Sequence, residues 1–159
     1  MLIEKIVGKI NDIDVTDRTV EYVDIEWFEA FKKVHRKTTE TGRDIGIRLD
    51  DTVFKTGLVT GDVLYMDDSI VVVVNTPPCE SILVTVAADY LHQVAKVCYE
   101  IGNRHAPLFF GDEDNTFVTP YNEPMLHILG QLHGITAEKK LLKFNFNRMI
   151  SATVSSHHH

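Results

Sequence analysis

The sequence predicts an α+β protein, with a small β-barrel or sandwich-like first domain and a ferredoxin-like βαββαβ second domain. Short segments rich in β-branched residues, separated by turn residues, fill the first 74 positions. After Pro77-Pro78, two segments with helical periodicity alternate with short β-type segments. This change of pattern at the prolines divides the chain into two domains of different kinds.

The strands of the first domain are predicted to be joined by tight turns. We expect one hairpin with Gly42 in its connection, because glycine takes a positive φ without steric cost, and another across Asp67-Asp68. Many short strands without intervening helices favour a barrel or sandwich over a parallel sheet. The predicted strands are residues 3–7, 20–27, 34–39, 44–49, 62–66 and 69–74.

A stiff joint is predicted at Asn75-Thr76-Pro77-Pro78, where the prolines lack amide donors and push the preceding residues toward extended geometry. We therefore place a β-rich partner- or peptide-binding domain at residues 1–74 and the ferredoxin-like domain at residues 75–148. Residues 149–159 show no apolar periodicity and are expected to form a flexible tail.

The second domain is predicted to begin with a strand at 82–86 and a helix at 87–101. Strands at 107–110 and 116–119, a helix at 123–133 and a last strand at 141–146 complete it. Gly102 and Gly134 are expected to end the two helices in the left-handed conformation. The first helix should bury one stripe, which consists of Leu91, Val94, Ala95, Cys98 and Ile101.

Composition limits the possible partners and location. The formal net charge is −7 and no Lys/Arg stripe is present, so we expect no nucleic acid partner. The longest aliphatic run, Ile70 to Val74, is far shorter than the roughly 20 residues that span a bilayer, so we expect no membrane segment. The N-terminus lacks a secretory pattern and the cysteines, Cys79 and Cys98, lack disulfide-framework spacing. These features predict a cytoplasmic protein.

His105 is the candidate metal ligand, because it lies between a predicted helix and a predicted strand and imidazole is the commonest protein metal ligand. One imidazole is insufficient, but a two-fold axis near the helix end would bring two copies together. Water or other groups would then complete an open, exchangeable site. A helix-capping role for His105 is the alternative.

The last three residues, His157, His158 and His159, could reach the His105 pair and complete the coordination shell. A terminal run of histidines is equally what a purification tag looks like. Both interpretations stay open on the sequence.

Three short motifs resemble the urease accessory nickel chaperones of the UreE family. They are Ile3-Glu4-Lys5-Ile6, Gly61-Asp62-Val63-Leu64 and Gly102-Asn103-Arg104-His105, of which the last is the specific one. The resemblance covers residues 1 to about 148. It implies an N-terminal domain for partner contact and a homodimer formed through the second domain, with His105 at the interface. It also implies delivery of nickel to a complex of apo-urease with an accessory GTPase.

Several points stay open beside this resemblance. Zinc or copper could bind the same ligands, because the order of intrinsic affinities does not favour nickel. The alternative function is a non-catalytic assembly module in which metal binding is incidental. No catalytic motif is present, so we expect no enzyme, although Cys79 or a metal-bound water at His105 would be the place for a hydrolytic reaction.

Overall fold

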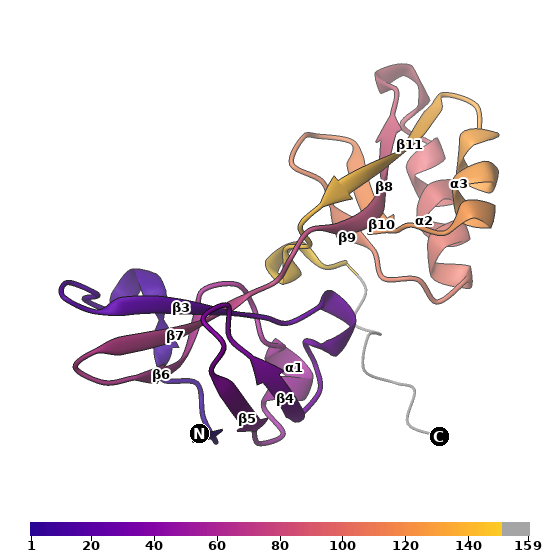
Figure 1. Ribbon diagram of the computed structural model, residues 1–159. Helices are drawn as coiled ribbons and strands as arrows, with labels where there is room; N and C mark the ends of the chain where they lie inside the picture. The colour runs from indigo at the N-terminus through magenta and orange to yellow at the C-terminus, as the bar shows by residue number, and fades with distance from the viewer. Residues whose placement is uncertain (151–159) are drawn as a thin grey trace. The chain divides into compact units, whose positions relative to one another are not determined.

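The computed structural model describes residues 1–150 of the chain and divides it into two compact units (Figure 1). The first unit is Met1–Pro77 and the second begins at Pro78, so the division falls within the Pro-Pro pair. Each proline lacks the amide hydrogen that would continue a strand ladder across the joint.

Two sheets form the first unit, and they fit a sandwich-like arrangement rather than a closed barrel. Both sheets are mixed, because β1 runs parallel to β5 and β3 runs parallel to β7. One sheet has the order β1-β5-β4, from β1 (Leu2–Ile3), β4 (Val34–Thr38) and β5 (Asp44–Arg48). The other has the order β2-β6-β7-β3, from β2 (Gly8–Lys9), β3 (Thr19–Asp24), β6 (Asp62–Met66) and β7 (Ile70–Asn75).

Both predicted hairpins of this unit are confirmed. Gly42 connects β4 to β5 with φ +91°, and the Thr39 amide donates to the Arg43 carbonyl at 2.9 Å. The Asp67 amide donates to the Ile70 carbonyl at 3.0 Å in the connection of β6 to β7. A short helix, α1 (Val53–Thr56), was not expected from the sequence.

A buried carboxylate joins the two sheets of the first unit. Glu21 on β3 has a side chain only 5% exposed, and Arg43 of the β4–β5 connection donates two hydrogen bonds to it at 3.0 Å each. The Thr39 hydroxyl donates a third at 3.2 Å. The hydrogen bonds from Arg43 outweigh the effect of burial and lower the pKa of Glu21. Glu21 is therefore held ionised where an unpaired carboxylate would be costly.

The second unit confirms the ferredoxin-like prediction. Its antiparallel sheet has the order β11-β8-β10-β9, and both helices cover one face (Figure 1). Strand β10 lies between β8 and β9, which makes the split βαβ arrangement. The elements are β8 (Cys79–Val86), α2 (Gln93–Asn103), β9 (Phe109–Phe110), β10 (Thr116–Pro120), α3 (Glu123–Gly130) and β11 (Ile135–Leu142).

Helix α2 buries a different stripe from the predicted one. Val97 and Ile101 are fully buried, and Val94 and Cys98 pack beside them. Leu91, by contrast, is 51% exposed, and Ala95 is also exposed. The predicted stripe was wrong at these two positions. Leu91 precedes α2, which begins at Gln93 rather than at residue 87, and Ala95 lies on the solvent side of the helix, whereas the buried Val97 was left out of the prediction.

Helix α3 is shorter than predicted, because it ends at Gly130. Gly134 has the expected positive φ, +72°, but it lies in the turn that leads from α3 into β11. A Cβ atom there would lie 2.2 Å from Cγ of Tyr90. Gly134 is therefore required both by its backbone conformation and by close packing.

The last strand begins six residues earlier than the sequence predicted. β11 is an edge strand whose residues 138–141 are exposed, so its charged sequence shows little alternation. The apolar Phe144 and Phe146, which suggested a strand at 141–146, lie beyond it. They belong to residues 143–150, here named the C-terminal strap, which crosses the sheet face opposite the helices and reaches β9.

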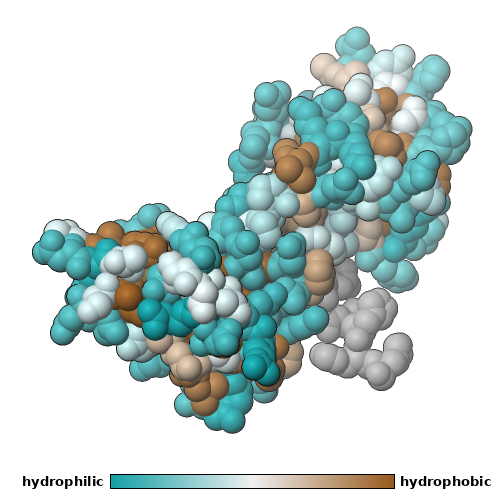
Figure 2. Space-filling model, in the orientation of Figure 1, coloured by the Kyte–Doolittle hydropathy of each residue, from teal (hydrophilic) through white to brown (hydrophobic). Residues whose placement is uncertain are grey.

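None of the helices in the described part of the chain is long and apolar enough to cross a membrane. On the face seen in Figure 2, apolar residues form small groups among hydrophilic ones. The largest exposed fractions among apolar side chains are those of Val34, Leu141 and Tyr99, at 67%, 67% and 65%.

Candidate metal centre

His105 lies at the end of α2, and the backbone there explains its position. Arg104 follows the last helical residue, and the amide of His105 donates to the carbonyl of Gly102 at 3.0 Å. The amide of Ala106 donates to the carbonyl of Ile101 at 3.3 Å. This pair of bonds is a Schellman motif, in which the residue at the position of His105 adopts the left-handed conformation.

His105 has φ +56°, a conformation that helix ends usually assign to glycine. The expectation that Gly102 takes it was wrong, because α2 continues through Gly102 and Asn103. A side chain in the left-handed region costs about 1 kcal/mol relative to glycine. Backbone strain of this kind gathers at functional positions. His105 is thus a residue that the helix end tolerates rather than prefers.

The side chains around His105 leave its imidazole at the surface. His105 and Arg104 are both exposed. Arg104 pairs with Glu100 one turn earlier, at 2.6 Å, and also donates to the Glu100 carbonyl at 3.0 Å. Arg104 therefore has a partner one turn earlier, Glu100 of α2.

One stripe of the exposed surface of α2 leads toward His105 and lies beside the exposed Lys96 and Asn103. Three exposed residues of α2 and one just before it are spaced by three or four positions; we name these four the α2 outer stripe: Leu91 before the helix, and Ala95, Tyr99 and Gly102 on it. Tyr99 is 65% exposed, and a Cβ atom at Gly102 would meet nothing within 4 Å. Sequence reasoning missed this surface, because it counted Leu91 and Ala95 as core.

The described residues contain no cluster of three or more His, Cys, Asp or Glu side chains with the geometry of a metal site. His35 is a buried residue of β4, where burial lowers its pKa and its Nε2 lies 2.9 Å from the Lys32 carbonyl. His127 lies 2.9 Å from the Gln131 side chain, and His133 packs edge-on against Tyr90. None of these histidines belongs to a cluster of three or more potential metal ligands in residues 1–150.

Three predicted site residues, His157, His158 and His159, lie outside the described residues. The chain can be followed to Ile150, whose amide donates to the carbonyl of Leu108 at 2.7 Å. The described chain thus ends beside the segment that leads back to His105. This proximity was not apparent from the sequence, because the alternating Phe144 and Phe146 suggested a strand that ended the domain.

Among the described residues, neither cysteine belongs to a cluster of potential metal ligands. The Cys79 sulfur lies 3.7 Å from the Ser81 hydroxyl at the start of β8, and Cys98 packs against the core, where burial raises the pKa of its thiol. A raised thiol pKa disfavours the nucleophilic thiolate.

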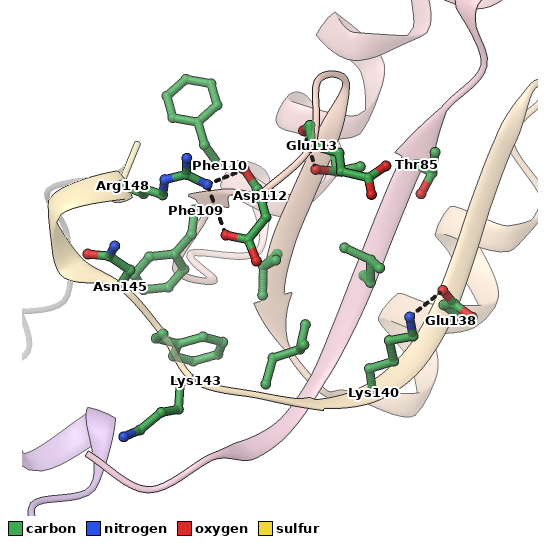
Figure 3. A pocket seen from close by; sticks show the side chains of 16 residues that line it. Thr85, Phe109, Phe110, Asp112, Glu113, Glu138, Lys140, Lys143, Asn145 and Arg148 are labelled. Atoms are coloured by element: carbon green, nitrogen blue, oxygen red, sulfur yellow. Dashed lines mark hydrogen bonds and ion pairs between the residues drawn. The ribbon is translucent and has the colours of Figure 1, made fainter. Parts of the chain in front are cut away.

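An open cavity of about 410 Å³ lies on the sheet face beneath the C-terminal strap (Figure 3). Arg148 reaches from the strap to Asp112 at 3.1 Å, and Glu138 and Lys140 pair at 3.4 Å on the opposite side. The strap therefore contacts the acidic turn 112–114 through Asp112. This turn lacks the spacing of oxygen ligands that a calcium loop has.

Comparison with known proteins identifies the two units. Residues 3–76 match the model described as "UreE urease accessory protein, N-terminal domain", and residues 80–159 match the corresponding C-terminal domain. The chain belongs to the UreE urease accessory protein family. The two matches meet at the Pro-Pro joint that separates the units.

Curated UreE relatives match nearly the whole chain. The urease accessory protein UreE of Helicobacter pylori strain G27 is 40% identical over 158 residues, which cover 99% of this chain and 89% of the relative. UreE of Helicobacter acinonychis is 39% identical over the same shares of both chains. UreE of Acetivibrio thermocellus is 40% identical over 144 residues, 90% of this chain and 88% of the relative.

Proposed function

We propose that this protein binds nickel as a homodimer and delivers Ni(II) during assembly of the urease active site. The observation that carries the proposal is the exposed, left-handed His105 at the end of α2 in a chain of the UreE family. A capping histidine would be expected to relieve strain, whereas this one costs backbone energy. A role as metal ligand would explain why histidine occupies this position despite the cost in backbone energy.

Dimerisation through the α2 outer stripe would supply the second imidazole. Ala95 and Gly102 are small enough for a second helix to approach closely, while Leu91 and Tyr99 offer apolar area. A two-fold axis repeats each contact, so a stripe that leads toward His105 brings both copies of this residue near the axis. Each chain then contributes one ligand to a shared ion.

The remaining ligands come from His157, His158 and His159 and from water in this proposal. A site with two fixed imidazoles and exchangeable further ligands releases its ion by ligand exchange, as a carrier requires. Zinc and copper bind imidazole as well and compete for the same site. Nickel is cargo here, so the protein acts without being an enzyme.

The partners follow from the family. The ion passes to apo-urease within a cytoplasmic activation complex that contains an accessory GTPase, and the first unit provides a contact surface for this complex. Its three-stranded sheet exposes Val34 on the edge strand β4, together with Leu2 on β1. Edge strands and exposed apolar side chains are features of protein-binding surfaces.

Titration calorimetry with Ni²⁺ tests the metal proposal. The experiment compares two variants in which the three terminal histidines are alanine, one with His105 and one with His105→Ala. We expect about one ion per two chains with His105 and a loss of at least tenfold in affinity without it. Equal binding by both variants would remove His105 from the site.

The alternative is an assembly module in which metal binding is incidental. An assembly module would make the same contacts with partner proteins, but His105 would not need to bind a metal ion. Urease activation in cells distinguishes the two functions at limiting nickel: delivery predicts that His105→Ala lowers activation and that added nickel restores it. Full activation by His105→Ala at limiting nickel would favour the assembly module.

A further inference from the structure

The segment that follows α2, residues 105–108, is held at its far end by a buried side chain. The hydroxyl of Thr119 on β10 donates to the carbonyl of Pro107 at 2.8 Å. Thr119 is fully buried, and the carbonyl of the next residue, Leu108, accepts from the amide of Ile150 at 2.7 Å. The segment is therefore fixed at both ends, by the backbone bonds at the end of α2 and by these two bonds.

Thr119 acts where the ladder between β9 and β10 stops. The last pair of that ladder is Val118 with Phe109. Pro107 has no amide hydrogen, so it cannot donate to a further step of an antiparallel ladder. A side-chain hydroxyl therefore takes over the contact between β10 and this segment.

The link between His105 and the bonded carbonyl is short and stiff. Pro107 is two residues from His105, which is at most about 7 Å of chain. The proline ring fixes its own φ, and the residue before a proline, here Ala106, is restricted to extended conformations. Fixing the carbonyl of Pro107 therefore restricts the direction in which the chain leaves His105.

We propose that Thr119 is a positioning residue of the metal site, because its hydroxyl fixes the segment that carries His105. This inference rests on the proposed metal site. An imidazole that is held in place before the metal arrives loses less freedom on binding, so the bond raises affinity without supplying a ligand. Groups that hold a metal ligand in place contribute about 10–100-fold in affinity. Because Thr119 acts through two residues of backbone, we expect the lower end, about tenfold.

Two substitutions separate the hydroxyl of Thr119 from the volume of its side chain. Thr119→Val keeps nearly the same shape but removes the donor, whereas Thr119→Ser keeps the donor and removes a buried methyl group. Both should lower stability, Val through the unpaired carbonyl of Pro107 and Ser through the cavity. Only Thr119→Val should lower metal affinity, whereas a role limited to stability would make the two variants alike.

Thr116→Val is the matched control. Thr116 lies on the same strand, is 7% exposed, and donates its hydroxyl to the carbonyl of Glu113. This bond fixes the turn that precedes β10 instead of the segment that carries His105. A general effect of losing a buried hydroxyl from β10 would therefore appear in Thr116→Val as well as in Thr119→Val.

Hydrogen exchange in the metal-free protein tests the link to the backbone by itself. The amide of Ala106 is bonded to the carbonyl of Ile101, so its exchange reports opening of the segment. We expect this amide to exchange about fivefold faster in Thr119→Val than in Thr119→Ser, because one more bond is lost. Equal exchange in the two variants would overturn the inference even if the metal site holds.

Ni²⁺ affinity is measured by chelator competition in the full chain with its three terminal histidines changed to alanine, here named the parent chain. We expect Thr119→Val to bind about tenfold more weakly than the parent chain, and Thr119→Ser and Thr116→Val to bind as it does. Unchanged affinity in Thr119→Val, or a loss of the same size in Thr119→Ser or Thr116→Val, would overturn the inference. Failure of the metal site itself is recognised separately, because His105→Ala would then bind nickel as the parent chain does.

Discussion

The amide of Ala106 donates to the carbonyl of Ile101 at 3.3 Å, and this bond closes the turn that holds His105 in the left-handed conformation. Ala106 also packs against the core cluster that contains Ile101. The turn is therefore fixed by backbone bonds and apolar packing on either side of His105, and neither requires an imidazole.

Replacing His105 with glycine should stabilise the protein while removing metal binding. Glycine adopts φ +56° freely, so we expect the free energy of unfolding to rise by about 1 kcal/mol. His105→Asn, which tolerates this conformation moderately, should lie between glycine and His105→Ala. Urea denaturation of the metal-free proteins measures the order. Destabilisation by His105→Gly would show that the imidazole is a structural cap.

The turn after α3 should be intolerant of a methyl group. Gly134→Ala places a Cβ atom 2.2 Å from the Tyr90 ring at a residue with φ +72°, so we expect a loss of about 2–4 kcal/mol. Gly130→Ala is the matched control, because Gly130 is helical and a Cβ atom there meets nothing within 4 Å. The control should gain up to about 1 kcal/mol. Thermal unfolding of both variants checks the pair.

The Glu21–Arg43 pair should make the first unit sensitive to acid. The folded-state pKa of Glu21 is lowered, so its stabilising contribution is fully present above the pKa of an unfolded glutamate, about 4.3. The contribution is lost as the pH falls through the lower, folded value. Arg43→Gln should therefore cost about 2 kcal/mol at pH 7 and less at pH 3. Denaturation at both pH values measures the difference, and an equal cost at both would contradict the role of this carboxylate.

The α2 outer stripe should control association. Tyr99→Glu places a charge on this exposed stripe, so we expect a shift toward monomers, with little change in unfolding of the monomer. Leu141→Glu is the control, because Leu141 is similarly exposed but lies on the edge strand β11. Sedimentation velocity over a concentration series distinguishes the two variants. Dimers of unchanged strength in Tyr99→Glu would exclude this stripe as the interface.

The sequence predicted the fold class and most of the strands, because alternation and turn chemistry are local properties. Gly42 and the Asp67-Asp68 connection fixed two hairpins that the structure contains. The edge strand β11 was misplaced, since residues 138–141 are exposed and show almost no apolar pattern. Phe144 and Phe146 have that pattern but pack against Phe109 from the strap, a long-range contact that no local signal reveals.

The candidate site, too, could be predicted only where local sequence patterns determine the structure. The position of His105 after a helix could be predicted, but its left-handed conformation could not, because Gly102 is the residue that usually adopts it. The exposure of Ala95 depends on which way α2 is rotated against the sheet, and that of Leu91 on where the helix begins. The predicted stripe left out the buried Val97 and counted these two exposed residues as core.

Subunit mixing tests the shared site most directly. Chains with His105 and chains with His105→Ala, all with the terminal histidines replaced by alanine, are denatured together in equal amounts, refolded and analysed by native mass spectrometry with Ni²⁺. Random pairing gives about one quarter of dimers with both imidazoles. A shared ion predicts nickel on about that quarter only, whereas nickel on mixed dimers as readily as on dimers with two His105 residues would contradict it.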